Sequence, residues 1–78
     1  MASRLQMNLT SIQADLLQEI QEQCHLNKTE VVENALMLLG WAVNEKRDGR
    51  TIASVDERRR VFKEISLPAL MRVRKAAA

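Results

Sequence analysis

Cys24 carries a thiol and His25 an imidazole, groups that can act as a nucleophile, a base or a zinc ligand, and each is the only residue of its kind in the 78-residue sequence. A catalytic thiol needs a base held beside it, and a structural zinc site needs about four ligands. The sequence also lacks a glycine-rich phosphate loop and a carboxylate pair beside a nucleophile. We therefore expect a protein that is not an enzyme and needs no metal or cofactor. Cys24 is interpreted as a small hydrophobe and His25 as a turn residue.

Three other side chains, Arg4, Gln6 and Asn8, each carry several hydrogen-bonding groups. They alternate with three apolar residues: Leu5, Met7 and Leu9. A period of two over about six residues predicts a strand with one polar and one apolar face. The residues that follow have helical spacing, so nothing near this strand can pair with it, and its backbone groups would stay unmatched. We expect it to pair with the same strand of a second copy.

Two helices should follow the strand. Thr10 with Gln13, and Asn27 with Glu30, have the three-residue spacing of a capping box. The first helix carries one apolar stripe: Ile12, Leu16, Leu17, Ile20 and Cys24. The second carries a wider apolar surface: Val31, Val32, Ala35, Leu36, Met37, Leu38, Leu39, Trp41, Ala42 and Val43. This width predicts a helix covered on more than one side, with Trp41 in the core or in a subunit interface.

The segment after the stop signal Asp48-Gly49 has two interpretations. Two β-prone runs, 51–56 and 61–67, are joined by a polar turn and predict a hairpin over 51–67. Ser54 and Glu57 could equally start a helix over 55–65. We favour the hairpin. Pro68 ends the preceding element, and residues 68–78 should form a basic tail with at most a short helix.

The formal net charge of +2 is unevenly distributed. Residues 1–26 have a net charge of −2, residues 27–50 are balanced, and residues 51–78 hold seven basic against three acidic residues, for +4. The three consecutive arginines Arg58, Arg59 and Arg60 belong to this basic segment. We interpret them as an exposed polar turn or as a patch for a DNA backbone or a protein partner.

Composition points to a globular chain that needs a partner subunit. It is 46% hydrophobic, 28% charged and 3% aromatic, which is typical of a helix-rich globular protein. A chain this short usually needs a disulfide, a metal or a partner, and a single cysteine excludes an intrachain disulfide. The longest apolar run, 35–43, is too short to cross a bilayer. We expect a soluble cytoplasmic protein of a reducing compartment, with no membrane contact.

A strand with alternating polar residues followed by two capped helices resembles the ribbon-helix-helix DNA-binding family of MetJ, Arc and CopG type. The resemblance covers residues 3–44 and rests on Arg4-Leu5-Gln6-Met7-Asn8-Leu9, on the stripe at Leu16, Leu17 and Ile20, and on the turn His25-Leu26-Asn27-Lys28-Thr29-Glu30. His25 departs from the family, which usually has glycine in a left-handed conformation there. The stretch 49–67 also looks like the C-terminal hairpin of some small members.

The resemblance implies an α+β, mostly helical homodimer in which the two N-terminal strands form an intersubunit ribbon. Residues 1–46 would be the DNA-binding and dimerisation domain, and residues 47–78 a C-terminal extension. The dimer core would contain the apolar residues of the strand and both helices: Leu5, Met7, Leu9, Leu16, Leu17, Ile20, Val32, Leu36 and Leu39.

It also implies the roles of the polar residues. The ribbon would enter the major groove of double-stranded DNA and place Arg4, Gln6 and Asn8 against base edges. Phosphates would bind at the start of the second helix, at Asn27, Lys28 and Thr29, where free amides, the helix dipole and an ammonium converge.

Three functions remain open at this point. The first is a sequence-specific transcriptional repressor that regulates its own operon, with higher-order assembly on DNA as a further step. The second is an antitoxin whose C-terminal segment binds a toxin. The third is an interaction module that dimerises or binds a protein without binding DNA.

Overall fold

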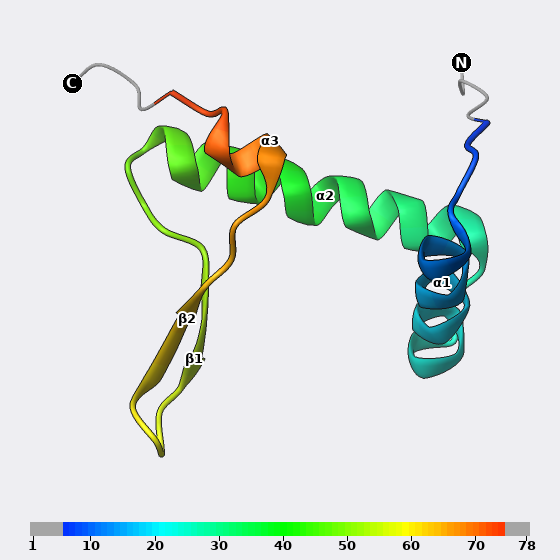
Figure 1. Cartoon of the computed structure of the whole chain (residues 1–78), viewed down its shortest axis with the longest axis horizontal. Coiled ribbons are helices and arrows are strands. Elements are labelled where there is room, and N and C mark those ends of the chain that lie inside the picture. Colours follow the sequence, from blue (N-terminus) through cyan, green and yellow to red (C-terminus); the bar gives the residue numbers. More distant parts are fainter. Residues whose placement is uncertain (1–5, 75–78) are drawn as a thin grey trace. The chain divides into compact units, whose positions relative to one another are not determined.

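The computed structural model describes residues 6–74 (Figure 1). Its elements are helix α1 (Ser11–Cys24), helix α2 (Lys28–Arg47), strand β1 (Ala53–Asp56), strand β2 (Val61–Glu64) and helix α3 (Pro68–Met71). The chain divides within α2 into two units, Met1–Asn34 and Ala35–Ala78. It is a small, mostly helical α+β fold with two main helices and a C-terminal hairpin, which confirms the predicted class at this level.

Helix α1 begins at the predicted capping box. The Gln13 amide donates to Thr10 Oγ1 at 3.2 Å, and the Thr10 amide donates to Gln13 Oε1 at 3.1 Å. Both bonds satisfy backbone donors that have no acceptor within the helix. The predicted start of this helix is therefore confirmed.

His25 ends α1 in the left-handed conformation, with φ 55° and ψ 46°. The amide of the next residue, Leu26, donates to Gln21 O at 3.2 Å, which is the bond that closes a Schellman-type helix end. A side chain with a Cβ is strained in this conformation, by about 1 kcal/mol. The sequence thus keeps a histidine where a glycine would be free of strain.

His25→Gly should accordingly stabilise the protein. The side chain is exposed, so its loss removes no buried contact, while relief of the left-handed strain should add about 0.5 to 1 kcal/mol of unfolding free energy per chain. Urea denaturation measures this change. His25→Ala is the matched control, because alanine keeps the Cβ, and it should unfold within about 0.5 kcal/mol of the parent protein. Equal stabilisation by both substitutions would contradict the strain at this position.

Helix α2 begins at the second predicted capping box and ends at a glycine. The Gly49 backbone has φ 82°, its amide donates to Lys46 O at 3.0 Å, and the Arg50 amide donates to Glu45 O at 2.9 Å. This pair of bonds is a Schellman motif, which requires the left-handed conformation that glycine adopts without strain. The predicted stop at Asp48-Gly49 is therefore confirmed.

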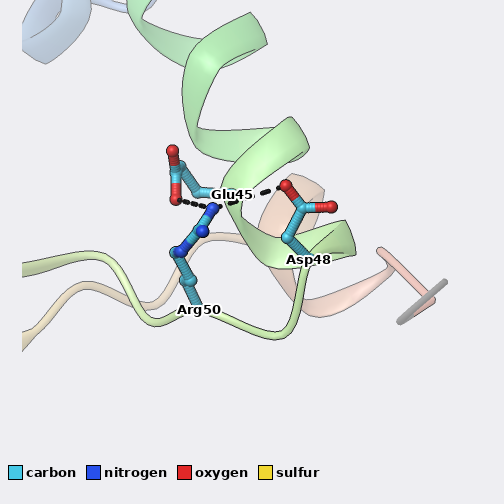
Figure 2. A network of polar contacts seen from close by, with 3 residues as sticks. All are labelled: Glu45, Asp48 and Arg50. Atoms are coloured by element: carbon cyan, nitrogen blue, oxygen red, sulfur yellow. Dashed lines mark hydrogen bonds and ion pairs between the residues drawn. The ribbon is translucent and has the colours of Figure 1, made fainter. Parts of the chain in front are cut away.

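A small ion-pair network covers the same helix end (Figure 2). One nitrogen of Arg50, Nη1, lies 3.0 Å from Glu45 Oε2 and 3.4 Å from Asp48 Oδ2. The Arg50 and Asp48 side chains are largely exposed, so the network is worth about 1 kcal/mol or less. The network links Arg50 to the last turn of α2 and to the residue that follows the helix.

The segment after α2 forms the predicted hairpin and not the alternative helix. Strands β1 and β2 pair antiparallel with Ala53 opposite Glu64 and Val55 opposite Phe62. The four residues between the strands form the turn, and Asp56 Oδ1 accepts hydrogen bonds from the amides of Arg58 and Arg59 at 3.1 and 3.3 Å. Arg60 completes the reversal in the left-handed conformation with φ 53°.

Helix α3 is the short helix that the basic tail was predicted to contain at most. It covers Pro68–Met71, with Pro68 in the first turn, where its missing amide leaves no helical bond unmade. Arg72 ends the helix. Residues 75–78 of the predicted tail lie outside the described residues.

The single chain buries few large side chains. Among the described residues Val31, Ala42 and Leu70 are the buried hydrophobic ones. The predicted dimer-core residues fall into two groups. Leu17, Ile20 and Val32 are half-buried, whereas Met7, Leu9, Leu16, Leu36 and Leu39 are exposed. Trp41 is 53% exposed, so the predicted covering of this residue is not supplied by the single chain.

Residues 6–10 precede α1 without strand pairing inside the described chain. The predicted N-terminal strand is therefore not seen within one copy, and two of its residues, Arg4 and Leu5, lie outside the described residues. Among the described helices, none combines the length and the apolar character that crossing a membrane requires.

Candidate nucleic-acid interface

The described residues of the predicted reading strand are exposed in the single chain. Gln6 and Asn8 are exposed, and so are the two apolar residues that alternate with them, Met7 and Leu9. Gln6, Met7 and Asn8 line a shallow, open and mostly polar depression. The amide groups of Gln6 and Asn8 are thus free to bind a ligand. Arg4, the third predicted base contact, lies outside the described residues.

The start of α2 holds the predicted phosphate-binding residues. The Glu30 amide donates to Asn27 Oδ1 at 2.8 Å, and the Asn27 amide donates to Glu30 Oε1 at 3.1 Å. Lys28 and Thr29 occupy the first turn, so their amides have no preceding helical carbonyl to bond. Both side chains are exposed. An anion at this helix end would therefore meet the Lys28 and Thr29 amides and the Lys28 ammonium.

Asn27 has the capping role that its spacing from Glu30 predicts. Its side-chain oxygen and its backbone amide are both used in the capping box with Glu30. Its main role is therefore to start the helix, and only its side-chain nitrogen is left to donate to an anion.

Glu30 affects this site in a way that the sequence did not reveal. Its carboxylate reaches back over the first turn of α2, the place where a phosphate would bind. The capping-box spacing of Asn27 and Glu30 predicted this hydrogen bond, but not that the carboxylate would compete with an anion. At α1 the equivalent residue is the neutral Gln13. The two helix starts thus have the same geometry and a different charge.

The arginine turn (Arg58–Arg60) is a second basic feature, in the other unit of the chain. The Arg59 Nε atom lies 3.9 Å from Asp56 Oδ2, and both side chains are well exposed, so this pair is weak. In the described part of the chain, Arg58 and Arg60 have no ion-pair partner. Their guanidinium groups are available to an anionic partner.

The described residues contain no cluster of three or more His, Cys, Asp or Glu side chains that could hold a metal ion. Cys24 is a free, exposed thiol next to the turn between the helices.

Comparison of the chain with protein-family models, with curated proteins and with solved structures gave no match.

Proposed function

We propose that this chain is a homodimeric DNA-binding repressor of ribbon-helix-helix type, which reads the major groove with paired N-terminal strands and regulates its own operon. The observation that carries the proposal is the exposed alternation at the N-terminus. Gln6 and Asn8 alternate with Met7 and Leu9, and in the single chain Met7 is 61% exposed, although an apolar strand face needs cover.

Exposure of the helices supports the dimer. Leu16 of α1 and Leu36 and Leu39 of α2 are all exposed in the single chain, Leu36 by 64%. Burial of one leucine side chain contributes about 1.5 to 3 kcal/mol. A 78-residue chain with three buried hydrophobic side chains among its described residues lacks this contribution until a second copy covers the stripe.

Two-fold symmetry supports the ribbon. In a symmetric antiparallel pair of identical strands, each residue lies opposite one that is an even number of positions away. Residues at even separations share a face of the strand. Every symmetric register therefore collects Met7 and Leu9 of both copies on one face, and Gln6 and Asn8 of both copies on the other.

The chemistry of the polar face suits base recognition. A glutamine or asparagine amide can donate to and accept from adenine in the major groove, and an arginine can donate twice to guanine. In the proposed dimer the face would present Arg4, Gln6 and Asn8 of each copy. The Lys28 and Thr29 amides at the start of α2 would then hold the DNA backbone and fix the orientation of the ribbon.

Replacement of Gln6 or Asn8 by alanine tests the reading strand. The site is first selected from random duplex DNA with the parent protein. Each substitution should then weaken binding to that site by about 1 to 3 kcal/mol per lost bidentate contact and relax the base preference at symmetric positions. Binding to random DNA should hardly change, because phosphate contacts supply it. Titration with labelled duplexes at fixed salt measures both affinities.

The matched control is Gln18→Ala, which removes an exposed amide from α1 and leaves the ribbon intact. It should bind both DNAs with the parent affinity. Wild-type affinity and preference in both Gln6→Ala and Asn8→Ala would show that the strand does not read DNA. Absence of any salt-dependent DNA binding by the parent protein would instead favour the interaction module.

The hairpin favours the antitoxin as a second candidate. Val55 and Phe62 lie opposite each other on β1 and β2 and are 64% and 65% exposed. Exposure of an apolar cross-strand pair to water is unfavourable on a two-stranded sheet, and a bound protein would cover it. An antitoxin should form a defined complex with the product of a neighbouring gene, and Phe62→Ser should weaken that complex while DNA binding persists.

A further inference from the structure

Gly40 has no explanation within the single chain. It lies inside α2, and among the glycines only Gly49 has a positive φ, so the backbone does not require a glycine at position 40. Apart from its chain neighbours and the nearby backbone of its own helix, no atom lies within 4 Å of the place where a Cβ would be, so no packing contact within the chain excludes a side chain. An interior glycine nevertheless weakens a helix, by about fivefold in the folding equilibrium relative to alanine.

Gly40 also lies at the centre of a symmetric pattern on α2. Glu33 precedes it by seven residues and Arg47 follows it by seven, which is close to two helical turns, so the three residues form one line along the helix. Leu36 and Met37 precede Gly40 by one turn and are 64% and 76% exposed. We call this surface, from Glu33 to Arg47 around Gly40, the glycine line.

The charged ends of the glycine line are unused in the single chain. Glu33 and Arg47 are both exposed. Within the described residues the ion pairs involve Arg50 and Arg59 with Glu45, Asp48 and Asp56, and neither Glu33 nor Arg47 takes part.

We propose that α2 crosses α2 of the second copy at Gly40, antiparallel and on the two-fold axis of the dimer. This inference rests on the proposed homodimer and adds its helix contact. A two-fold axis at Gly40 brings each residue opposite the one that lies equally far on the other side. Met37 then meets Val43 of the second copy and Leu36 meets Asn44, on either side of the glycine, where the missing side chain leaves room for close approach.

Charge complementarity determines the orientation. In the antiparallel crossing Glu33 lies opposite Arg47 of the second copy, and the symmetric pair lies on the other side of Gly40. Each pair is about 10 Å along the helix from the axis. A parallel crossing would put Glu33 against Glu33 and Arg47 against Arg47, which is repulsive. The interface thus combines the Gly40 contact and the Met37–Val43 pairs with two ion pairs.

Gly40→Ala tests the close approach of the two helices, because the proposal predicts a weaker dimer and a free helix face predicts a tighter one. On a free helix face alanine strengthens the helix and should tighten a folding-linked dimer. At a close crossing the added methyl groups of both copies collide, so the dissociation constant of the dimer should rise by about tenfold or more. Sedimentation equilibrium over a wide concentration range measures the constant.

Charge reversal tests the orientation. Glu33→Arg and Arg47→Glu should each raise the dissociation constant by about fivefold or more at low salt, because two attractions become two repulsions. The double variant Glu33→Arg/Arg47→Glu restores both pairs with exchanged signs and should dimerise more tightly than either single variant. Each single substitution also changes the interaction of its charge with the dipole of its own helix. The double variant carries both of these changes, so they cannot explain a recovery of dimerisation. Lys63→Glu makes the same change in net charge as Arg47→Glu, but on the hairpin, so it is the matched control for that variant and should leave the constant unchanged.

The outcomes separate this inference from the proposed function. A parent protein that stays monomeric at all concentrations overturns the homodimer and the crossing together. A dimeric parent with a tighter Gly40→Ala dimer, or with a double reversal no better than the single ones, overturns the crossing alone. DNA binding by the ribbon would then still stand.

Discussion

Leu36→Ala should cost the protein most of its stability, whereas Leu38→Ala should cost almost nothing. The two leucines are a matched pair, because both lie in α2 and they are 64% and 65% exposed in the single chain. Residues two apart lie on nearly opposite sides of a helix. Only Leu36 is in the predicted dimer core, where truncation of a leucine costs about 2 to 5 kcal/mol, or about 4 to 10 kcal/mol for the two copies.

Thermal melting over a hundredfold range of protein concentration measures this effect. In the proposed dimer folding and association are one event, so the midpoint of the parent protein should rise with concentration. Leu36→Ala should lower the midpoint at every concentration, and Leu38→Ala should shift the unfolding free energy by about 0.5 kcal/mol per chain or less. Equal effects of the two substitutions, or midpoints that do not depend on concentration, would contradict the dimer core.

The helix boundaries could be predicted because the signals that determine them are local. Both capping boxes join residues three apart, and the hydrogen bonds of Thr10 with Gln13 and of Asn27 with Glu30 form as their spacing predicts. The end of α2 at Gly49 is equally local, because it depends on one residue that adopts a left-handed conformation without strain.

The hairpin was harder to predict because two local signals compete. Ser54 and Glu57 have the spacing of a helix cap, and the surrounding residues are β-prone. The structure shows what decides between them. Asp56 accepts the amides of Arg58 and Arg59, and Arg60 takes a left-handed conformation, so the chain reverses where a helix would have to continue. The strained arginine gave no signal in the sequence, since glycine or asparagine is usual there.

The candidate site could be predicted only in part, because some of its features depend on neighbouring residues of one chain and others depend on a second copy. The spacing of Gln6 and Asn8 identifies a polar face, but strand pairing needs a second copy, and residues 6–10 pair with no strand within the described chain. The capping box located the start of α2 correctly. What spacing could not reveal is the balance of charge there, where the Glu30 carboxylate and the Lys28 ammonium share one helix turn.

Lys28→Glu should move DNA affinity and protein stability in opposite directions. The substitution removes a cation from each phosphate site of the proposed dimer and adds an acid beside the Glu30 carboxylate. Two lost contacts per dimer should lower the slope of log affinity against log salt by about two. With the added repulsion, affinity for specific and random DNA alike should fall by at least about tenfold at low salt.

Stability should change the other way, because a negative charge in the first turn of α2 interacts favourably with the helix dipole, by about 0.3 to 1 kcal/mol. The gain should lie at the lower end, since Glu30 already occupies this turn. Lys63→Glu makes the same change in net charge on β2 and serves as the control. In the proposed dimer the hairpin lies outside the DNA-binding residues 1–46, so at the same salt concentration Lys63→Glu should weaken DNA binding much less than Lys28→Glu. If Lys28→Glu binds DNA normally at low salt and Lys63→Glu does not, the phosphates are held by the hairpin and its arginine turn, and the start of α2 does not face the DNA.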